Sequence, residues 1–209
     1  MKQVIDINHW NRKEHFEFFS SFDDPFWGTT LEIDFTGLYH RSRQKRQSFF
    51  LSSLHAIMKC ANATEAFRLR TDGKGVIKYH KVGVSPTIGR DDGTFGFGFF
   101  DYDADFETFA YHASQEIRRV KECSGLAFPA VPECAYAIRY SSLPWFSFSE
   151  MKHAGSFKTG DSAPRISTGR LIEKEKRLLL PISITVHHGL VDGLHVGEFV
   201  KELSLMTKG

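Results

Sequence analysis

The sequence predicts a mixed α/β architecture, an α+β sandwich in which helices pack against a mixed β-sheet, as one domain over residues 1–209. Helical and strand-like segments follow one another without the regular βα alternation that builds a purely parallel sheet. No internal repeat or low-complexity linker divides the chain, and 209 residues are enough for one large hydrophobic core.

Four segments have apolar residues at helical spacing, and we expect them to form helices: 10–20, 48–63, 105–122 and 193–206. The second is the most apolar, with Phe50, Leu51 and Leu54 among its residues, so it should be well buried. The basic stretch 41–46 is interpreted as solvated surface.

Strands are predicted where apolar and polar residues alternate or where apolar runs are short. In 29–35, Leu31, Ile33 and Phe35 share one face. The turn Asp72-Gly73 between 67–70 and 76–79 predicts a hairpin. The remaining candidates are 95–100, 135–141, 165–172 and 178–187.

Composition excludes several classes of function. With 27 basic and 25 acidic residues the formal charge is +2, so nothing global favours nucleic acid or an anionic membrane as a partner. We expect no signal peptide and no transmembrane helix, because no run approaches about 20 apolar residues. Three widely spaced cysteines without a CxxC pair predict no disulfide or zinc site and fit a reducing cytoplasm.

The segment His187-His188-Gly189-Leu190-Val191-Asp192-Gly193 carries the strongest chemical signal. It lies between a predicted buried strand and a predicted helix. Histidine is the usual general base near neutral pH, because its pKa is close to the operating pH. The carboxylate of Asp192 could cap the helix or anchor a salt bridge that holds the loop.

Two other interpretations of this segment stay open from the pattern alone. The adjacent histidines could simply end a surface strand. A metal site is less favoured, because adjacent residues of a strand point to opposite faces and His187 and His188 cannot easily share one ion.

Several spaced motifs together resemble the chloramphenicol acetyltransferase family of CoA-dependent acyltransferases. The HHxxxDG segment is joined by others in the family's order: Trp10-Asn11-Arg12 with the helix that follows, Phe67 to Ile77, Ser141-Ser142-Leu143-Pro144-Trp145, Leu178-Leu179-Leu180-Pro181 and His195-Val196-Gly197. The resemblance covers nearly the whole chain. It implies acetyl transfer from acetyl-CoA to the primary hydroxyl of chloramphenicol, which confers antibiotic resistance, without a covalent acyl-enzyme and without a metal.

The resemblance also assigns roles to three catalytic residues. His188 takes the proton of the acceptor hydroxyl as that oxygen attacks the thioester carbonyl. Ser141 donates a hydrogen bond to the resulting oxyanion. Ser167 stands where the family has a threonine that holds a water at the intermediate, and it keeps the hydroxyl but lacks the methyl group.

Other residues are implied to shape the site. Asp192 pairs with Arg12 and locks the histidine loop. Phe18 and Phe19 wall the pocket, and Phe19, where the family often has tyrosine, keeps an edge contact to the imidazole.

Two departures concern the acceptor pocket. Met151 replaces a phenylalanine and His153, which adds polarity, replaces an apolar residue. These departures predict either weaker binding of chloramphenicol or an acceptor other than chloramphenicol. Arg170 falls near a basic residue that meets CoA phosphate. The family is a homotrimer with active sites between subunits, and the resemblance implies the same here.

Three alternatives remain beside this hypothesis. The chain could be a related O-acetyltransferase for another hydroxyl acceptor, or a non-catalytic relative that binds hydrophobic ligands. It could also be the catalytic core of a dihydrolipoyl acyltransferase, although those often have Asp-His in place of His187-His188 and carry a lipoyl domain. Condensation domains of peptide synthetases share the motif but need about twice this length.

Overall fold

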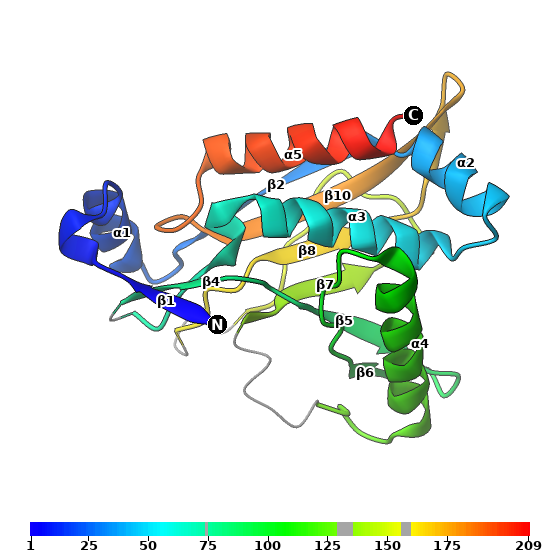
Figure 1. Cartoon of the computed structure of the whole chain (residues 1–209), viewed down its shortest axis with the longest axis horizontal. Coiled ribbons are helices and arrows are strands. Elements are labelled where there is room, and N and C mark those ends of the chain that lie inside the picture. Colours follow the sequence, from blue (N-terminus) through cyan, green and yellow to red (C-terminus); the bar gives the residue numbers. More distant parts are fainter. Residues whose placement is uncertain (74, 129–135, 156–159) are drawn as a thin grey trace.

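The computed structural model describes residues 1–73, 75–128, 136–155 and 160–209. Its centre is a seven-stranded mixed sheet in the order β2-β10-β8-β7-β5-β6, with β9 paired to β10 (Figure 1). The strands are β2 (Phe26–Asp34), β5 (Val84–Gly89), β6 (Phe95–Phe97), β7 (Ile138–Ser142), β8 (Arg165–Thr168), β9 (Ile172–Lys174) and β10 (Arg177–His187).

The pairing in this sheet is both parallel and antiparallel. β10 runs antiparallel to β2 and β8, whereas β8, β7 and β5 run parallel to one another. β6 returns antiparallel to β5. The predicted mixed α/β class is therefore confirmed.

β10 is the longest strand and leads directly to the histidine segment. It pairs with β2 from Leu179 to His187 and with β8 from Ile182 to Thr185. Ile182, Ile184 and Val186 are fully buried. Because β8 pairs with this strand as far as Thr185 and β2 as far as His187, backbone hydrogen bonds fix the place from which its last side chains project.

Helices cover one face of the sheet (Figure 1). α3 and α5 contact each other, α5 contacts β2, α2 contacts β10 and α4 contacts β5. Ser48 caps α3 through the Leu51 amide, and Asp105 caps α4 through the Thr108 amide. The bounds are α2 (Thr36–Gln44), α3 (Phe49–Ala63), α4 (Phe106–Glu122) and α5 (Gly193–Thr207).

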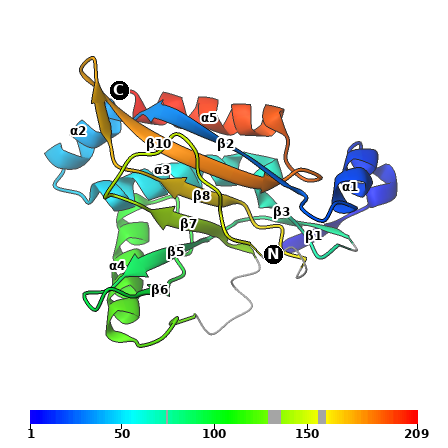
Figure 2. The ribbon, with the colours of Figure 1, turned by 180° about the vertical axis from the view of Figure 1, so that it is seen from behind.

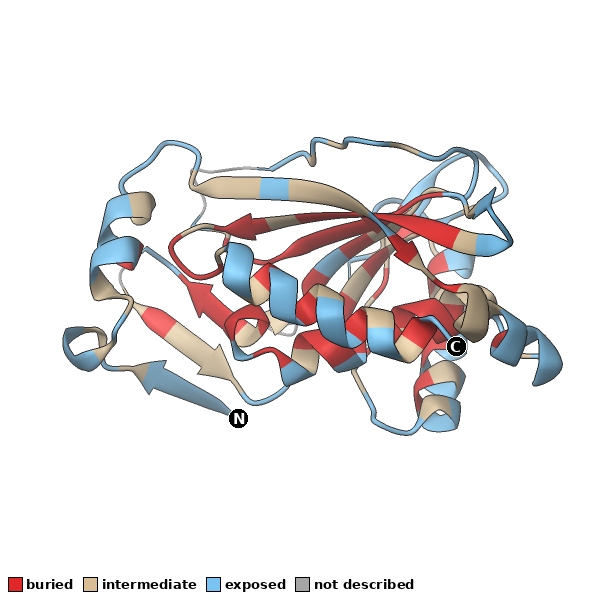
Figure 3. Cartoon of the chain, turned by 90° about the horizontal axis from the view of Figure 1, so that it is seen from above, coloured by how far each residue is buried: buried red, intermediate tan, exposed pale blue. Residues whose placement is uncertain are grey.

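Among the described residues, no helix covers the opposite face. Figure 2 shows this face with the stretch that follows β7, residues 143–155, in yellow-green, passing over the strands. Buried residues concentrate in the strands and in the helix sides that face them, as Figure 3 shows from above. In the described part of the chain, the helices thus pack on one face of the sheet and this irregular stretch lies on the other.

A small antiparallel sheet, β1-β4-β3, and helix α1 lie at one end of the molecule, near the end of β10. The predicted hairpin around Asp72-Gly73 is confirmed by the pairing of β3 with β4, but its first strand, predicted at 67–70, begins at Leu69 because Glu65–Arg68 form a 3₁₀ turn. The elements at this end are β1 (Lys2–Ile5), the 3₁₀ turn η1 (Ile7–His9), α1 (Lys13–Ser20), η2 (Glu65–Arg68), β3 (Leu69–Thr71) and β4 (Val76–Tyr79).

The other predicted helices and strands are present, with corrections at particular places. The helix predicted at 10–20 begins at Lys13. The strand predicted at 95–100 ends at Phe97. The one predicted at 165–172 is two strands, because the Arg170 amide turns to the Phe146 carbonyl and leaves the sheet. The predicted strand at 135–141 begins at Ile138, and Ala135 lies outside the described residues.

Besides the 3₁₀ turns η1 and η2, one helix and two strands were not predicted: α2, β1 and β5. The stretch 41–46 is exposed apart from Ser42, as predicted for solvated surface, but it belongs largely to the unpredicted helix α2. The Arg41 guanidinium of this helix donates to the Met206 carbonyl. β5 contains Pro86, which argues against a central strand. Within the described residues, none of the helices combines the length and hydropathy that a membrane crossing needs.

Candidate active site at the end of β10

The turn after β10 holds His188 in a fixed place. The amides of Leu190 and Val191 both donate to the His187 carbonyl, and the His188 amide donates to the Pro25 carbonyl at 2.8 Å. A side chain at Gly189 would be crowded, because a Cβ would lie 3.2 Å from the Phe16 Cα and 3.1 Å from the His187 ring. The turn therefore packs closely against the beginning of β2 and against α1.

The His188 ring is held between aromatic side chains from two other elements. Phe19 of α1 stacks on it with ring centroids 3.8 Å apart and an interplanar angle of 12°. Trp27 of β2 lies 5.6 Å away, and its indole nitrogen donates to the Val191 carbonyl. The predicted edge contact from Phe19 is thus wrong, because α1 presents the face of the ring. Nδ1 of His188 is buried and has no hydrogen-bond partner among the described residues.

Asp192 holds the second half of the segment in two ways at once. Its carboxylate caps α5, accepting from the amides of Leu194 and His195, and His195 Nδ1 accepts from the Asp192 amide. Its other oxygen accepts from the Arg12 guanidinium. The predicted contact between Arg12 and Asp192 is therefore present, and both suggested duties of this carboxylate are met. Burial acts to raise the pKa of Asp192. The Arg12 hydrogen bond and the charges of His195 and Arg12 together have the larger effect, so the pKa of Asp192 is lowered overall.

His187 points away from the catalytic candidate and into the protein. Its side chain is buried and meets the edge of Phe26 with ring centroids 5.7 Å apart. Burial, with the charge of His188 adding to it, lowers the pKa of His187 to about 4. His187 is thus a neutral core residue and belongs to the packing of the turn.

This burial predicts a loss of stability in mild acid. The unfolded chain takes up a proton on His187 near pH 6.5 and the folded chain only near pH 4, so the free energy of unfolding should fall as pH drops through this window. Urea unfolding at several pH values measures the slope. A His187→Gln variant, which does not titrate there, should show a shallower slope between pH 6.5 and 4; an equal slope would contradict the assignment.

A row of hydroxyls crosses the uncovered face of the sheet. Ser141 of β7 pairs with Ser167 of β8, which pairs with Ser183 of β10. Cross-strand partners project to the same face, so the row places the two predicted catalytic serines side by side. The Thr87 hydroxyl donates to Ser141 at 3.3 Å. Ser167 is buried, whereas Ser141 is half-buried.

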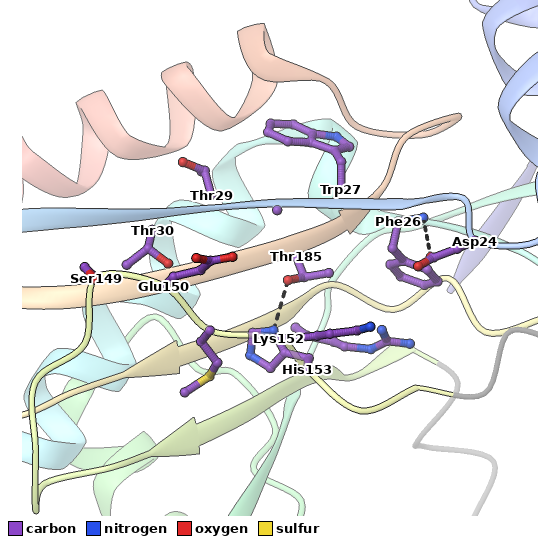
Figure 4. Close-up of a pocket in the computed structure, with 13 residues that line it drawn as sticks. Asp24, Phe26, Trp27, Thr29, Thr30, Ser149, Glu150, Lys152, His153 and Thr185 are labelled. Carbon is purple, nitrogen blue, oxygen red and sulfur yellow. Dashed lines mark hydrogen bonds between the residues drawn. The ribbon is translucent and has the colours of Figure 1, made fainter.

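Met151 and His153 line a cavity of about 450 Å³ on this face, whereas Phe18 and Phe19 are not among its lining residues (Figure 4). His153 bridges two strands: Nε2 lies 2.8 Å from the Ser167 hydroxyl and Nδ1 lies 2.9 Å from the Thr185 hydroxyl. Burial and the charge of Arg165 lower the pKa of His153. The cavity is further lined by Asp24, Phe26, Trp27, Gly28, Thr29, Thr30, Ser149, Glu150 and Lys152.

Arg165 gives this cavity a buried cation. Its guanidinium is paired with the Asp161 carboxylate at 3.0 Å and lies 4.1 Å from the centre of the Phe26 ring. Neither Arg165 nor Thr185 nor Trp27 was predicted from the sequence. No local pattern marks them, since each reaches the site only through strand register.

The remaining predicted residues lie at the edges. Phe18 is 60% exposed and forms an aromatic group with Phe19 and Phe22. Arg170 is exposed and lines a second cavity of about 270 Å³ with Ser142 and Pro144. Among the described residues, no three His, Cys, Asp or Glu side chains gather as a metal site would need.

Within one chain, two groups remain separate. Among the described residues, His188 makes no hydrogen bond to Ser141 or Ser167, whose partners are Thr87 and His153. Trp27 is common to both surroundings, since it contacts the His188 ring and lines the cavity. A single chain thus presents His188 at one place and the hydroxyl row with its cavity at another.

Comparison with known proteins names the family. A family model described as chloramphenicol acetyltransferase matches residues 2–204. The chain belongs to the chloramphenicol acetyltransferase family. It is therefore an acyltransferase, as the motifs predicted, and the predicted family is confirmed.

Relatives match over almost their whole length. A chloramphenicol acetyltransferase of Clostridium perfringens is 29% identical over 201 residues, which are 95% of this chain and 91% of the relative. One of Staphylococcus aureus is 29% identical and covers 97% of this chain and 94% of its own. A solved structure titled chloramphenicol acetyltransferase is 33% identical, with a TM-score of 0.92 and full coverage of both chains.

A more distant structure shares the fold alone. The dihydrolipoamide acetyltransferase of Azotobacter vinelandii superposes with a TM-score of 0.69 at 15% identity, over 93% of this chain and 86% of that one. The dihydrolipoyl acyltransferase alternative is thus supported by similarity of fold alone. The family model favours the chloramphenicol acetyltransferase interpretation instead.

Proposed function

We propose that this chain is a chloramphenicol O-acetyltransferase, a single domain that transfers the acetyl group of acetyl-CoA to the antibiotic's primary hydroxyl. The observation that carries the proposal is the His188 ring, stacked on Phe19 and fixed at the end of β10 in a chain of this family. Antibiotic resistance and a cytoplasmic location belong to the same proposal.

His188 acts as the general base. Because Nδ1 is buried, Nε2 is the nitrogen that we expect to take the proton from the acceptor hydroxyl. The acceptor oxygen forms a bond to the thioester carbonyl carbon, and the carbonyl electrons move onto its oxygen. When the intermediate collapses, the carbon–sulfur bond breaks and the imidazolium returns the proton to the departing thiolate.

The hydroxyl row supplies uncharged hydrogen-bond donors for the negative charge that develops on the carbonyl oxygen. Ser141 donates to the oxyanion, while its own oxygen accepts from Thr87. Ser167 lies beside it in register and serves the intermediate from the next strand. Phe18, Phe19, Met151 and His153 contribute to acceptor binding.

The second cavity combines the apolar wall and the cation that acetyl-CoA binding requires. The cavity next to Ser142 has apolar walls from Phe49, Phe50 and Leu180, and the exposed guanidinium of Arg170 lies at its margin. A guanidinium is well suited to bind phosphate. We assign Arg170 to CoA binding on this ground.

A homotrimer would unite the two separated groups. The base of one subunit and the hydroxyl row of its neighbour would then face each other across an interface on the uncovered sheet face. Light scattering coupled to size exclusion should give a mass near three chains of 23.8 kDa. A monomer with full activity would overturn the shared-site proposal.

The function is tested by the release of free CoA thiol from acetyl-CoA in the presence of chloramphenicol. A product carrying one acetyl group on the primary hydroxyl is expected by mass spectrometry and NMR. The same assay with other hydroxyl acceptors separates the competing proposal of a different acceptor, which the polar His153 and Arg165 in the cavity favour. Tight chloramphenicol binding without product would instead support a non-catalytic binding protein.

Ser141→Ala should lower kcat by about 10²–10³-fold, because one hydrogen bond to the oxyanion is lost. KM for both substrates should change little, since the bond strengthens in the transition state. Ser147→Ala, at an exposed position in the segment that follows β7, is the matched control and should keep wild-type kcat. A kcat within threefold of wild type in Ser141→Ala would remove this serine from the mechanism.

A further inference from the structure

The imidazole of His153 contacts the Ser167 hydroxyl, although His153 lies outside the strands of the sheet. His153 comes from the segment between β7 and β8, yet its ring joins hydroxyls of two adjacent strands, Ser167 on β8 and Thr185 on β10. Figure 4 shows the ring at the cavity, with the bond to Thr185 drawn. Ser167 is only 1% exposed, and His153 is the side-chain partner of its hydroxyl among the described residues.

The chemistry of a neutral imidazole limits how these three groups share their protons. One ring nitrogen carries a hydrogen and donates, and the other accepts. Burial and the nearby Arg165 guanidinium, itself paired with Asp161, both disfavour a second proton on the ring. One of the two hydroxyls must therefore donate to the ring while the other accepts from it.

We propose that His153 is a positioning residue for Ser167: Thr185 donates to Nδ1, Nε2–H donates to Ser167, and the Ser167 proton is thereby directed to the reacting group. This inference rests on the proposed function for the identity of the reacting group. The inference adds a series of hydrogen bonds with a defined direction, from Thr185 through His153 to Ser167, outside the segment 187–193.

The direction of the chain has a physical advantage for a serine. A hydroxyl whose oxygen already accepts a hydrogen bond is a better donor, because successive bonds polarise one another. A serine also lacks the methyl group that limits the rotation of a threonine side chain, so an external partner can fix its rotamer. The imidazole supplies this partner at 2.8 Å.

The tautomer can be measured without any activity. In protein labelled with ¹⁵N-histidine, the His153 signals are those missing from His153→Gln. We expect a protonated Nε2 and an unprotonated Nδ1, and a shift of the Nε2 signal in Ser167→Ala. Protonation at Nδ1 instead would overturn the proposal. This result stands even if the protein acetylates no chloramphenicol, in which case only the proposed function fails.

Kinetics test whether His153 acts through Ser167. His153→Leu removes both hydrogen bonds and should lower kcat about tenfold. His153→Gln, whose amide reaches about as far as Nε2, should restore kcat to within twofold, whereas His153→Asn reaches only the Nδ1 position and should not. In the Ser167→Ala background, His153→Leu should cause no further loss.

Two controls separate this role from damage to the fold. His112→Leu replaces an exposed histidine of α4 and should leave kcat unchanged. The melting temperatures of the His153 variants show whether the β7–β8 segment remains in place. Additive losses in kcat for folded His153→Leu and Ser167→Ala would show that the two residues act independently, which contradicts the proposal.

Discussion

His188→Ala is expected to lower kcat by about 10²–10⁴-fold, the usual contribution of a general base. The hydrogen bond that fixes this turn is made by the His188 backbone amide to Pro25, so the substitution should leave the turn intact. KM for acetyl-CoA and for chloramphenicol should remain within a few-fold of wild type. Steady-state thiol release, with both substrates varied, measures these constants.

A matched substitution gives the control. His112→Ala on α4 is the matched histidine substitution outside the site. If His188→Ala keeps more than a tenth of the wild-type kcat while folded, the base must be another group.

The turn that holds His188 could be predicted because its signal is local. His188, Asp192 and Gly193 lie within six residues, and the cap that Asp192 makes on α5 follows from ordinary helix chemistry. The buried helix α3 and the strand β10 were likewise predictable, because their apolar patterns match the surfaces they bury. Here local sequence preference and tertiary packing agree.

The rest of the site depends on contacts that are distant in sequence. Arg12 and Asp192 are 180 residues apart, and only the family resemblance joined them. The bridge from His153 to Ser167 and Thr185 requires both the path of the β7–β8 segment and the register of β8 with β10. The orientation of Phe19 depends on where α1 docks. None of these can be obtained from spacing alone.

Asp192→Ala should destabilise the protein by about 2–3 kcal/mol and greatly reduce turnover. The substitution removes a helix N-cap, which typically contributes about 0.5–2 kcal/mol, and leaves the Arg12 guanidinium without its carboxylate. Arg12 is only 15% exposed and Asp192 29%, so this pair is worth more than a surface ion pair but less than a fully buried one. Urea unfolding and thiol release measure the two effects.

Asp192→Asn and Arg12→Gln separate the cap from the ion pair. Asparagine still caps α5 but carries no charge, so Asp192→Asn should lose less stability than Asp192→Ala. The lowered pKa of Asp192 also means that the pair stabilises the fold above about pH 4, the unfolded value, and that this stability is lost as pH falls through the lower folded value. The double variant Asp192→Asn with Arg12→Gln should lose less than the sum of the two single losses. If the losses in the free energy of unfolding were strictly additive, Arg12 and Asp192 would stabilise the histidine turn independently. The contribution of Asp192 to the turn would then come from the cap of α5 alone.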